Sequence, residues 1–336
     1  MKNLFIGIDF SKLKIDASFF ERGKMKVFTH KVFENNKEGF KQMLCWLKTQ
    51  SDVPMGEWMF CGEHTGLHSH PLSEWLTSKG LFIWIDSPLQ IKCSMGIQRI
   101  KSDKVDSKQL ALYAYRFEDR ARQYTTASKA LKSLRLLYAF RGRLMKNKVS
   151  LSQAATEMRA VIKRDPTARS IYEQSIREVR RLEKEIKQIN DKMLGCLKQD
   201  PDLYENYKLL TSITGIAFVN ASAMILCTDN FTRFENARQY ACYAGMAPFG
   251  KSSGTSKNTT LKVSKIANQE IKALLTQAAK CAVKHDPELR EYYNRKIKEG
   301  KQPWLVINNV RNKLIHRAYA VIERREPYMK NYVIQN

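Results

Sequence analysis

Four carboxylates stand where a folded sheet and a helix would bring their side chains together. Asp9 ends the apolar run "NLFIGID", and Glu63 ends a second run, "EWMFCGE". Asp103 and Asp106 lie three residues apart in "RIKSDKVDSKQLALYA", so a helix there places both on one face. Clustered carboxylates repel one another, and oxygen-rich sites of this kind suit Mg²⁺ or Mn²⁺. We predict that the four acids hold two such ions, a pair that clamps the attacking and leaving oxygens of a phosphodiester exchange.

Other titratable side chains in this part of the chain are weaker candidates for metal ligands. We expect Asp16 in the second strand, away from the four acids, and Asp86 at a strand end, outside the set of ligands. His64, His68 and His70 crowd together in "EHTGLHSH". No cysteine or fourth ligand accompanies them, so contact with DNA or a catalytic water is favoured over a zinc site.

A second candidate site is "YAGMAPFGKSSGTSKNTTLKVSK", residues 243–265, within a stretch that has no acid between Glu235 and Glu270. A serine in a glycine-rich loop among cations is placed as a nucleophile on phosphate requires. A phosphate-binding loop and a linker are the open alternatives. The cations expected to contact phosphate here are Lys251, Lys257, Lys262 and Lys265.

The charge of the chain indicates a polyanionic partner. The 336 residues hold 58 Lys plus Arg against 33 Asp plus Glu, a formal net charge of +25. Each phosphate that a cation neutralises releases counterions, so this excess favours nucleic acid over small neutral metabolites. From Arg120 to Thr156 there are nine Lys or Arg and no acid, which favours phosphate contact over a merely solvated helix face. The cations assigned to this contact are Lys129, Lys132, Arg135, Arg141, Arg143, Lys146 and Lys148.

The pattern of elements predicts an α/β N-terminal domain over residues 1–125. Three strands fill roughly 3–33, a helix runs over 37–50, and a strand, a helix and a strand follow at 57–62, 70–79 and 81–85. A helix over about 104–117 completes the order of an RNase H-like fold, a mixed sheet with helices packed on it.

The rest of the chain reads as helical. Residues 126–204 are predicted to form a coiled-coil helical hairpin, because 128–163 is helix-forming and a seam at spacings of three and four runs from Val179 to Met193. Residues 205–336 are predicted to be a third, mainly α-helical domain. In it, Gly215 in "LLTSITGIAFVNASAMI" joins two apolar stretches as in a helix-hairpin-helix that holds a phosphate, or as a plain structural turn.

The seven cysteines are scattered and form no C-x-x-C pair, which argues for a reducing compartment. No secretory signal and no apolar run as long as a membrane span is visible, so we expect a cytoplasmic, nucleoid-associated bacterial protein without a membrane partner.

These motifs together resemble a known family. The blocks "GIDFSK", "GEHTG", "KSDKVDSKQLALYA", "ITGIA" and "FENARQYACYAGMAP", then "SSG" and "SK", occur in the order found in the DEDD transposases of the IS110 insertion-sequence family, relatives of the pilin-gene DNA invertase. The resemblance covers about 3–325, and the N-terminal part is similar to the RuvC-type Holliday-junction resolvases.

The resemblance implies a RuvC-like domain, a coiled-coil linker and a C-terminal transposase domain. It implies that Asp9, Glu63, Asp103 and Asp106 are the metal-binding tetrad and that Ser253 is the nucleophile that becomes linked to a DNA phosphate. It also implies a homo-oligomer, a dimer or a tetramer when assembled on DNA, that acts on donor and target DNA with a non-coding guide RNA, so that base pairing reads sequence.

The chain departs from the family pattern at a few positions. Ser107 replaces a frequent alanine, Ala267 a common glycine, and Lys272 a frequent arginine, whose bidentate grip on phosphate a lysine lacks. Ser252 precedes Ser253, so the nucleophile is assigned by register. Two other functions stay open: a structure-specific endonuclease that uses the same tetrad with water as nucleophile, and a non-catalytic nucleic-acid-binding protein.

Overall fold

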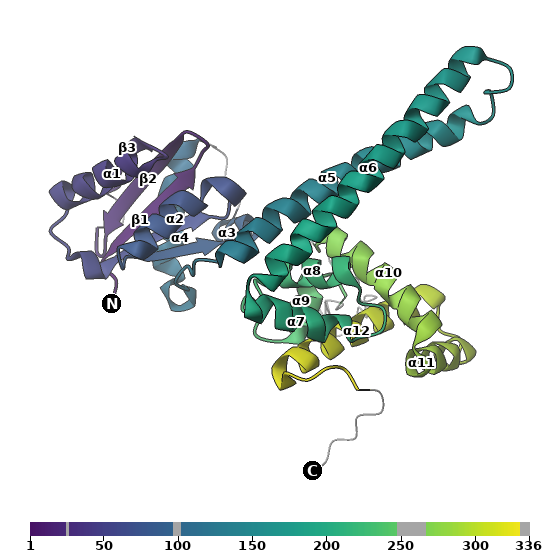
Figure 1. Ribbon diagram of the computed structural model, residues 1–336. Helices are drawn as coiled ribbons and strands as arrows, with labels where there is room; N and C mark the ends of the chain where they lie inside the picture. The colour runs from purple at the N-terminus through teal and green to yellow at the C-terminus, as the bar shows by residue number, and fades with distance from the viewer. Residues whose placement is uncertain (25–26, 97–101, 247–266, 330–336) are drawn as a thin grey trace, which may run out of the picture. The chain divides into compact units, whose positions relative to one another are not determined.

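The computed structural model describes residues 1–24, 27–96, 102–246 and 267–329. Contacts within the chain divide it into two units, Met1–Thr126 and Ala127–Asn336. The first is a sheet with helices and the second is helical (Figure 1). The predicted α/β domain followed by a mainly helical region is thus confirmed. The boundary predicted between residues 204 and 205 stays a prediction.

The first unit is built on a five-stranded mixed sheet in the order β3-β2-β1-β4-β5. β1 and β2 pair antiparallel, as do β2 and β3, whereas β1, β4 and β5 run parallel. The strands are β1 (Leu4–Phe10), β2 (Lys14–Glu21), β3 (Thr29–Glu34), β4 (Trp58–Glu63) and β5 (Phe82–Asp86). Short 3₁₀ turns lie at Met55–Glu57, Gly66–His68 and Glu118–Arg120.

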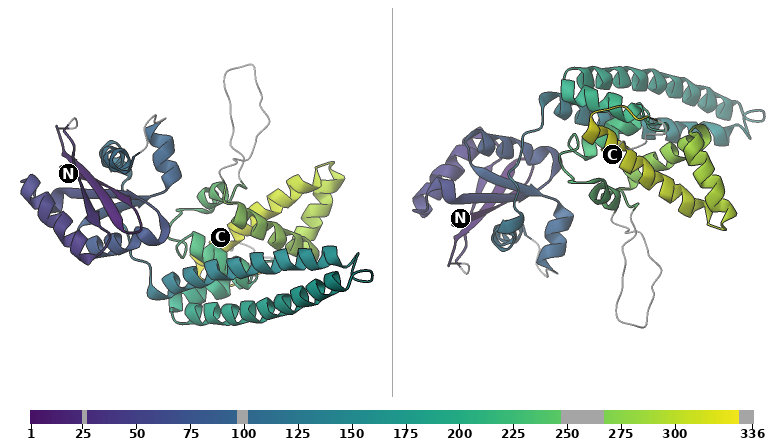
Figure 2. Two further views of the ribbon diagram at one scale, coloured as in Figure 1. Left: turned by 90° about the horizontal axis from the view of Figure 1, so that it is seen from above. Right: turned by 90° about the horizontal axis from the view of Figure 1, so that it is seen from below.

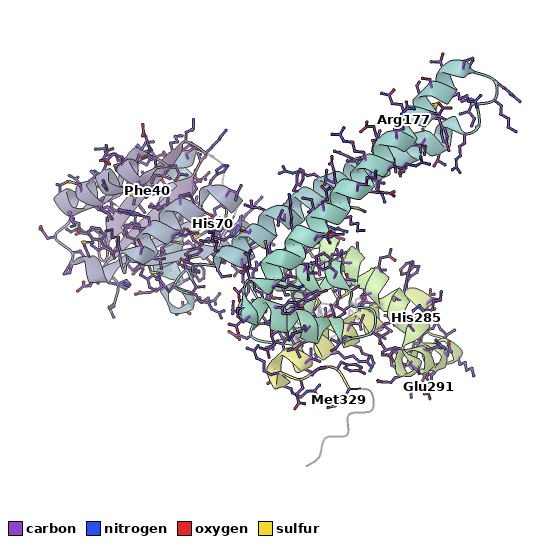
Figure 3. The ribbon with its side chains drawn as sticks, viewed as in Figure 1. Phe40, His70, Arg177, His285, Glu291 and Met329 are labelled. Carbon is purple, nitrogen blue, oxygen red and sulfur yellow. The ribbon has the colours of Figure 1, made fainter. Side chains whose placement is uncertain are left out.

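Helices cover both faces of this sheet (Figure 2). α1 (Lys37–Gln50), which carries Phe40 (Figure 3), and α2 (His70–Ser78) bury Phe40 and Leu72 against one face. Ile6 and Ile8 of β1 belong to the same cluster. α3 (Pro88–Met95) and α4 (Asp103–Arg116) cover the other face, which carries Phe5. Because side chains alternate along a strand, odd-numbered residues of β1 face α4. The helix α3 was not expected from the sequence.

The second unit begins with a long antiparallel hairpin of α5 (Lys129–Met158) and α6 (Pro166–Lys198), which extends beyond the other helices of that unit (Figure 1). Ile186, Ile189 and Met193 of the predicted seam are buried in one cluster with Leu134 and Leu144 of α5. The buried part of the seam is therefore covered within the same chain. A coiled coil in the strict sense stays a prediction.

Six shorter helices follow among the described residues of this unit and share one apolar core with the base of the hairpin. They are α7 (Pro201–Thr211), α8 (Phe218–Cys227), α9 (Ala237–Tyr243), α10 (Gln269–His285), α11 (Pro287–Lys298) and α12 (Pro303–Arg324). Asp-Pro pairs start α6, α7 and α11, because the aspartate side chain accepts a backbone N–H of the first turn while proline fits the first helical position.

All seven cysteines are free. Across the described ranges, none of the helices combines the length and the apolar character that a membrane crossing requires.

Candidate functional site

A row of acids crosses four strands at the edge where the parallel strands end. Asp9 of β1 lies opposite Asp16 of β2, and Glu63 of β4 lies opposite Asp86 of β5. Ile8 pairs with Gly62, so the next residues, Asp9 and Glu63, are neighbours across β1 and β4. By strand alternation all four side chains belong to the face that α4 covers.

The helix α4 adds the other two predicted ligands to this row. Its N-terminus is fixed by Ser102, whose Oγ accepts the N–H of Val105 at 3.3 Å, so Asp103 and Asp106 occupy the first turn. Such a turn favours negative charge, because unpaired N–H groups and the helix dipole point there.

Glycine 7 allows α4 to approach this closely. A Cβ built on Gly7 would lie 2.0 Å from the carbonyl oxygen of Ser107 and 2.2 Å from the nitrogen of Ala111. Next to this contact, the buried hydroxyls of Ser18 and Ser107 are hydrogen-bonded at 2.8 Å, which ties α4 to β2. The serine found in place of the family's frequent alanine thus has a structural role here.

The acids interact strongly through space. Burial, as the largest cause, and the charges of Asp103, Asp106, Glu63 and Asp16, in that order, together raise the pKa of Asp9 from 3.8 to about 6. The structure therefore brings the four sequence-predicted acids within electrostatic range of one another. A carboxylate held in this way gains from any cation that enters the row.

One cation of the chain already reaches the row. Lys14 Nζ donates to Asp103 Oδ2 at 2.7 Å and to Asp16 Oδ2 at 3.1 Å. Asp16, 3% exposed, also bonds His30 Nε2 through Oδ1 at 2.9 Å. The expectation that Asp16 lies away from the four acids is thus wrong, because the β1–β2 turn sets it directly opposite Asp9.

Asp86 closes the other end of the row. It accepts the hydroxyl of Tyr113 on α4 at 2.7 Å, and its own backbone carbonyl accepts the N–H of His64. Burial and this carboxylate together raise the pKa of the Tyr113 hydroxyl. Asp86 therefore has hydrogen-bond partners within the protein. That it is not a metal ligand stays a prediction.

The three histidines near Glu63 do not form a cluster around one point. His70, at the start of α2, bonds the hydroxyl of Tyr124 through Nδ1 at 3.0 Å (Figure 3). The rings of His64 and His70 meet edge to face at 5.8 Å, and His68 is exposed in the preceding turn.

The row of acids fits a divalent cation by donor chemistry but not in its present side-chain arrangement. Among the described residues, no three acidic, histidine or cysteine side chains converge closely enough to chelate one ion as they stand. The donor set is nevertheless made of carboxylate oxygens, which suit Mg²⁺. Asp103, with half of its side chain exposed, sits at the start of a helix where it can turn. The residues fit such an ion by chemistry and charge, and sharing it requires side chains to rotate inward.

The basic residues of the hairpin fall into two groups. The first group, with partners inside the protein, includes Arg135 with Asp229, Arg141 with Asn190 at 2.7 Å, and Lys148 with Glu183 at 3.1 Å. The second group, Lys129, Arg143 and Lys146, is exposed, and Lys132 is partly exposed. The exposed cations are the better candidates for phosphate contact.

The predicted nucleophile Ser253, with Ser252, Lys251, Lys257, Lys262 and Lys265, lies outside the described residues. Both ends of that segment are described. Asn308 Nδ2 donates to the carbonyl of Met246 at 2.9 Å, and Asn268 caps α10 and donates from Nδ2 to the hydroxyl of Tyr243 at 2.9 Å.

Gly215 connects α7 and α8 with a φ of +98°, a region that favours glycine. A Cβ there would lie 2.5 Å from the carbonyl oxygen of Ala278 on α10. These contacts give the glycine a packing role, and its predicted phosphate contact stays a prediction.

Sequence reasoning did not single out Gly7, Lys14 or His30. A signal for Lys14 was present, because its even number places it on the same face of β2 as Asp16. Its contact with Asp103, 89 residues further on, has no sequence signal.

Comparisons with known proteins give the context of this geometry. A sequence model described as "Transposase", of the DEDD IS110 type, matches residues 6–163. A second, described as "Transposase IS116/IS110/IS902 family", matches residues 207–294, and together they cover more than two thirds of the chain.

Similar proteins span the chain almost end to end. The pilin gene-inverting proteins of Moraxella bovis and Moraxella lacunata are each 26% identical over 336 residues, which covers 98% of this chain and 99% of theirs. A 43.6 kDa protein of insertion element IS110 from Streptomyces coelicolor is 33% identical over 93 residues, 28% of this chain and 23% of that protein.

Proposed function

This chain belongs to the IS110 family of transposases, and we propose that it cuts and rejoins DNA as a metal-dependent, serine-using recombinase. The observation that supports this most directly is the meeting of Asp9, Glu63, Asp103 and Asp106 at one edge of the sheet, with the pKa of Asp9 raised to about 6. Carboxylates held this close repel one another, and without a bound cation this repulsion destabilises the folded state.

The four acids would hold divalent cations, which supply positive charge next to the reacting phosphate. Members of DEDD families typically depend on metal, and Mg²⁺ or Mn²⁺, as two ions, matches the oxygen donors. Asp9 and Glu63 come from rigid strand ends, while Asp103 and Asp106 come from the first turn of α4. Gly7 and the Ser18–Ser107 hydrogen bond keep that turn against the strands.

The reaction would use Ser253 as nucleophile. Its Oγ attacks a DNA phosphorus, so an O–P bond forms, the bond from phosphorus to the 3′ oxygen breaks, and the departing 3′ oxygen takes up the proton that the serine gives up. The free 3′ oxygen can later attack a phosphoserine bond, which restores the serine. Bond energy is conserved, so no nucleotide cofactor is required.

The architecture supports a finer assignment. A sheet in which β1–β3 are antiparallel and β4 and β5 extend it in parallel is the arrangement expected of an RNase H-like, RuvC-type domain. We assign the hairpin α5–α6 as the linker that the family describes as a coiled coil, and the helices after it as the C-terminal transposase domain.

The partners follow from the family and the charge. The relatives from Moraxella are named for inverting a pilin gene, so inversion of a DNA segment is one form that strand exchange takes. For this chain we propose donor and target DNA, a non-coding guide RNA, assembly as a dimer or a tetramer on DNA, and work in the bacterial cytoplasm at the nucleoid. The net charge of +25 supports nucleic acid partners.

The test is a covalent-adduct assay on DNA that carries the ends of the element, with Mg²⁺ and the RNA encoded beside the gene. The wild-type chain should become linked to DNA in a form that survives denaturation. Ser253→Ala should abolish the adduct while leaving DNA binding within a few-fold, and Ser252→Ala should retain it.

Two results would count against the proposal. If Ser253→Ala still cuts DNA and no adduct appears with wild type, water is the nucleophile and the protein is a structure-specific endonuclease. If Asp9→Asn and Glu63→Gln leave every activity unchanged, the acid row is not catalytic.

A further inference from the structure

Two arginines on α12 are nearly buried, but their surroundings differ. Arg317 donates to Asp286 at 2.8 Å and to Glu288 at 2.6 Å, so carboxylates compensate its charge. Arg311, six residues earlier, is 7% exposed. Within the described part of the chain its one hydrogen bond runs from Nη1 to the hydroxyl of Thr276 on α10, at 3.1 Å.

The guanidinium of Arg311 is thus a buried cation without a counter-charge among the described residues. Its Nε is sealed from solvent and has no acceptor there. Burial lowers the pKa of this guanidinium, yet an arginine keeps its proton in proteins. A buried charge without a partner is unfavourable, and natural sites pair it with an anion.

One donor of the guanidinium can be reached by an anion from outside. Thr276 takes Nη1 and Nε is sealed from solvent, which leaves Nη2 for a charge-assisted hydrogen bond to a phosphate oxygen. Nη2 is not sealed in the way Nε is, and Thr276 itself is partly exposed, so this end of the side chain lies close to the surface.

Residues of α10 next to Arg311 supply a hydrogen-bond acceptor and a second cation. Thr276 donates its own proton to the carbonyl of Lys272 at 2.6 Å, so its oxygen is free to accept from Arg311. Lys272 lies one turn earlier on the same face of α10, which brings a second cation to this face. Asn308, one turn before Arg311, holds the carbonyl of Met246.

We propose that the guanidinium of Arg311, between α10 and α12, binds a backbone phosphate of nucleic acid through Nη2, with Lys272 as a second contact. The requirement for an anion rests on the burial of Arg311 alone. The choice of nucleic acid as its source rests on the proposed function.

The experiment uses the full chain and three variants. Arg311→Met keeps the aliphatic stem and removes the charge, Arg311→Lys keeps the charge without the fork, and Lys298→Met removes one exposed cation of α11 as a control. Affinity for a non-specific DNA duplex is measured at several salt concentrations. Thermal unfolding is measured in phosphate and in chloride at equal ionic strength.

We expect Arg311→Met to lower DNA affinity by about 10-fold and to reduce the slope of log K against log salt by about one unit, with Arg311→Lys in between. Lys298→Met should change affinity by less than about 3-fold. Inorganic phosphate should raise the melting temperature of wild type and leave that of Arg311→Met unchanged.

Other outcomes overturn the inference. If Arg311→Met melts lower than wild type in chloride and phosphate stabilises both equally, the guanidinium is satisfied inside the fold. If phosphate stabilises wild type alone while DNA affinity is equal, the site takes a free anion and its assignment to nucleic acid is wrong. Absence of the Ser253 adduct would refute the proposed function, but it would not change the phosphate stabilisation and DNA affinity measured for the Arg311 variants.

Discussion

Replacing Asp9 by asparagine should stabilise the protein at neutral pH when no divalent cation is present. Burial and the neighbouring carboxylates raise the pKa of Asp9 from 3.8 to about 6. The folded state therefore holds this proton more tightly than the unfolded state does. The stability that comes from the tighter binding of this proton is fully present below pH 4. It is lost as pH rises from about 4 to 6 and is absent above that range.

The size of the effect follows from the shift. A change of about two pKa units corresponds to roughly 3 kcal/mol, because each unit is worth about 1.4 kcal/mol. Asp9 is partly exposed, so solvent screening reduces this to about 2 kcal/mol. For a domain of this size, that is a rise of about 5–10 °C in the melting temperature.

The assay is thermal unfolding from pH 4 to 8 in chelator, with Asp52→Asn as a control at an exposed position. Asp9→Asn should match wild type near pH 4 and melt higher at pH 7.5, while Asp52→Asn should follow wild type throughout. Adding Mg²⁺ should raise the melting temperature of wild type and leave Asp9→Asn unmoved. Equal stability of Asp9→Asn and wild type at pH 7.5, or a difference that does not depend on pH, would refute the reasoning.

Two further substitutions probe how the row of acids is held. Gly7→Ala should destabilise the protein by about 3 kcal/mol in chemical denaturation, because the added methyl group meets the backbone of α4. Gly56→Ala is the control and should be nearly neutral, because a Cβ there has nothing within 4 Å. Equal losses of stability in the two variants would contradict this packing. Lys14→Met should lower the melting temperature in chelator, because the ammonium beside Asp103 is lost. Mg²⁺ should restore the melting temperature of this variant, because the ion would replace the positive charge of the ammonium. Lys12→Met is the control, and an unchanged melting temperature of Lys14→Met in chelator would count against a role for Lys14.

Much of the N-terminal unit could be predicted because the acids sit at the ends of apolar runs. Asp9 and Glu63 follow strands that the sequence marks clearly, and a helix that starts at Asp103 places Asp106 on the same face. The helix α3 was missed since it buries only Ile91 and so shows no periodic pattern.

The misplacement of Asp16 has a definite cause. Its strand was expected, but its partner across the sheet depends on the length of the turn between β1 and β2, where Ser11 N–H donates to Lys14 O at 2.9 Å. That register sets Asp16 opposite Asp9, and a shift of one residue would have turned it to the other face.

The sequence by itself determined the family, the mixed sheet, the long hairpin and that the acids predicted as ligands lie near one another at the sheet edge, because these depend on local periodicity and on motifs read in order. Only the tertiary structure decided that Lys14 reaches Asp103, that Gly7 admits α4, and that Arg311 meets a lone hydroxyl on α10. Such contacts join residues far apart in the chain, and their energies depend on burial and distance, which local patterns do not record.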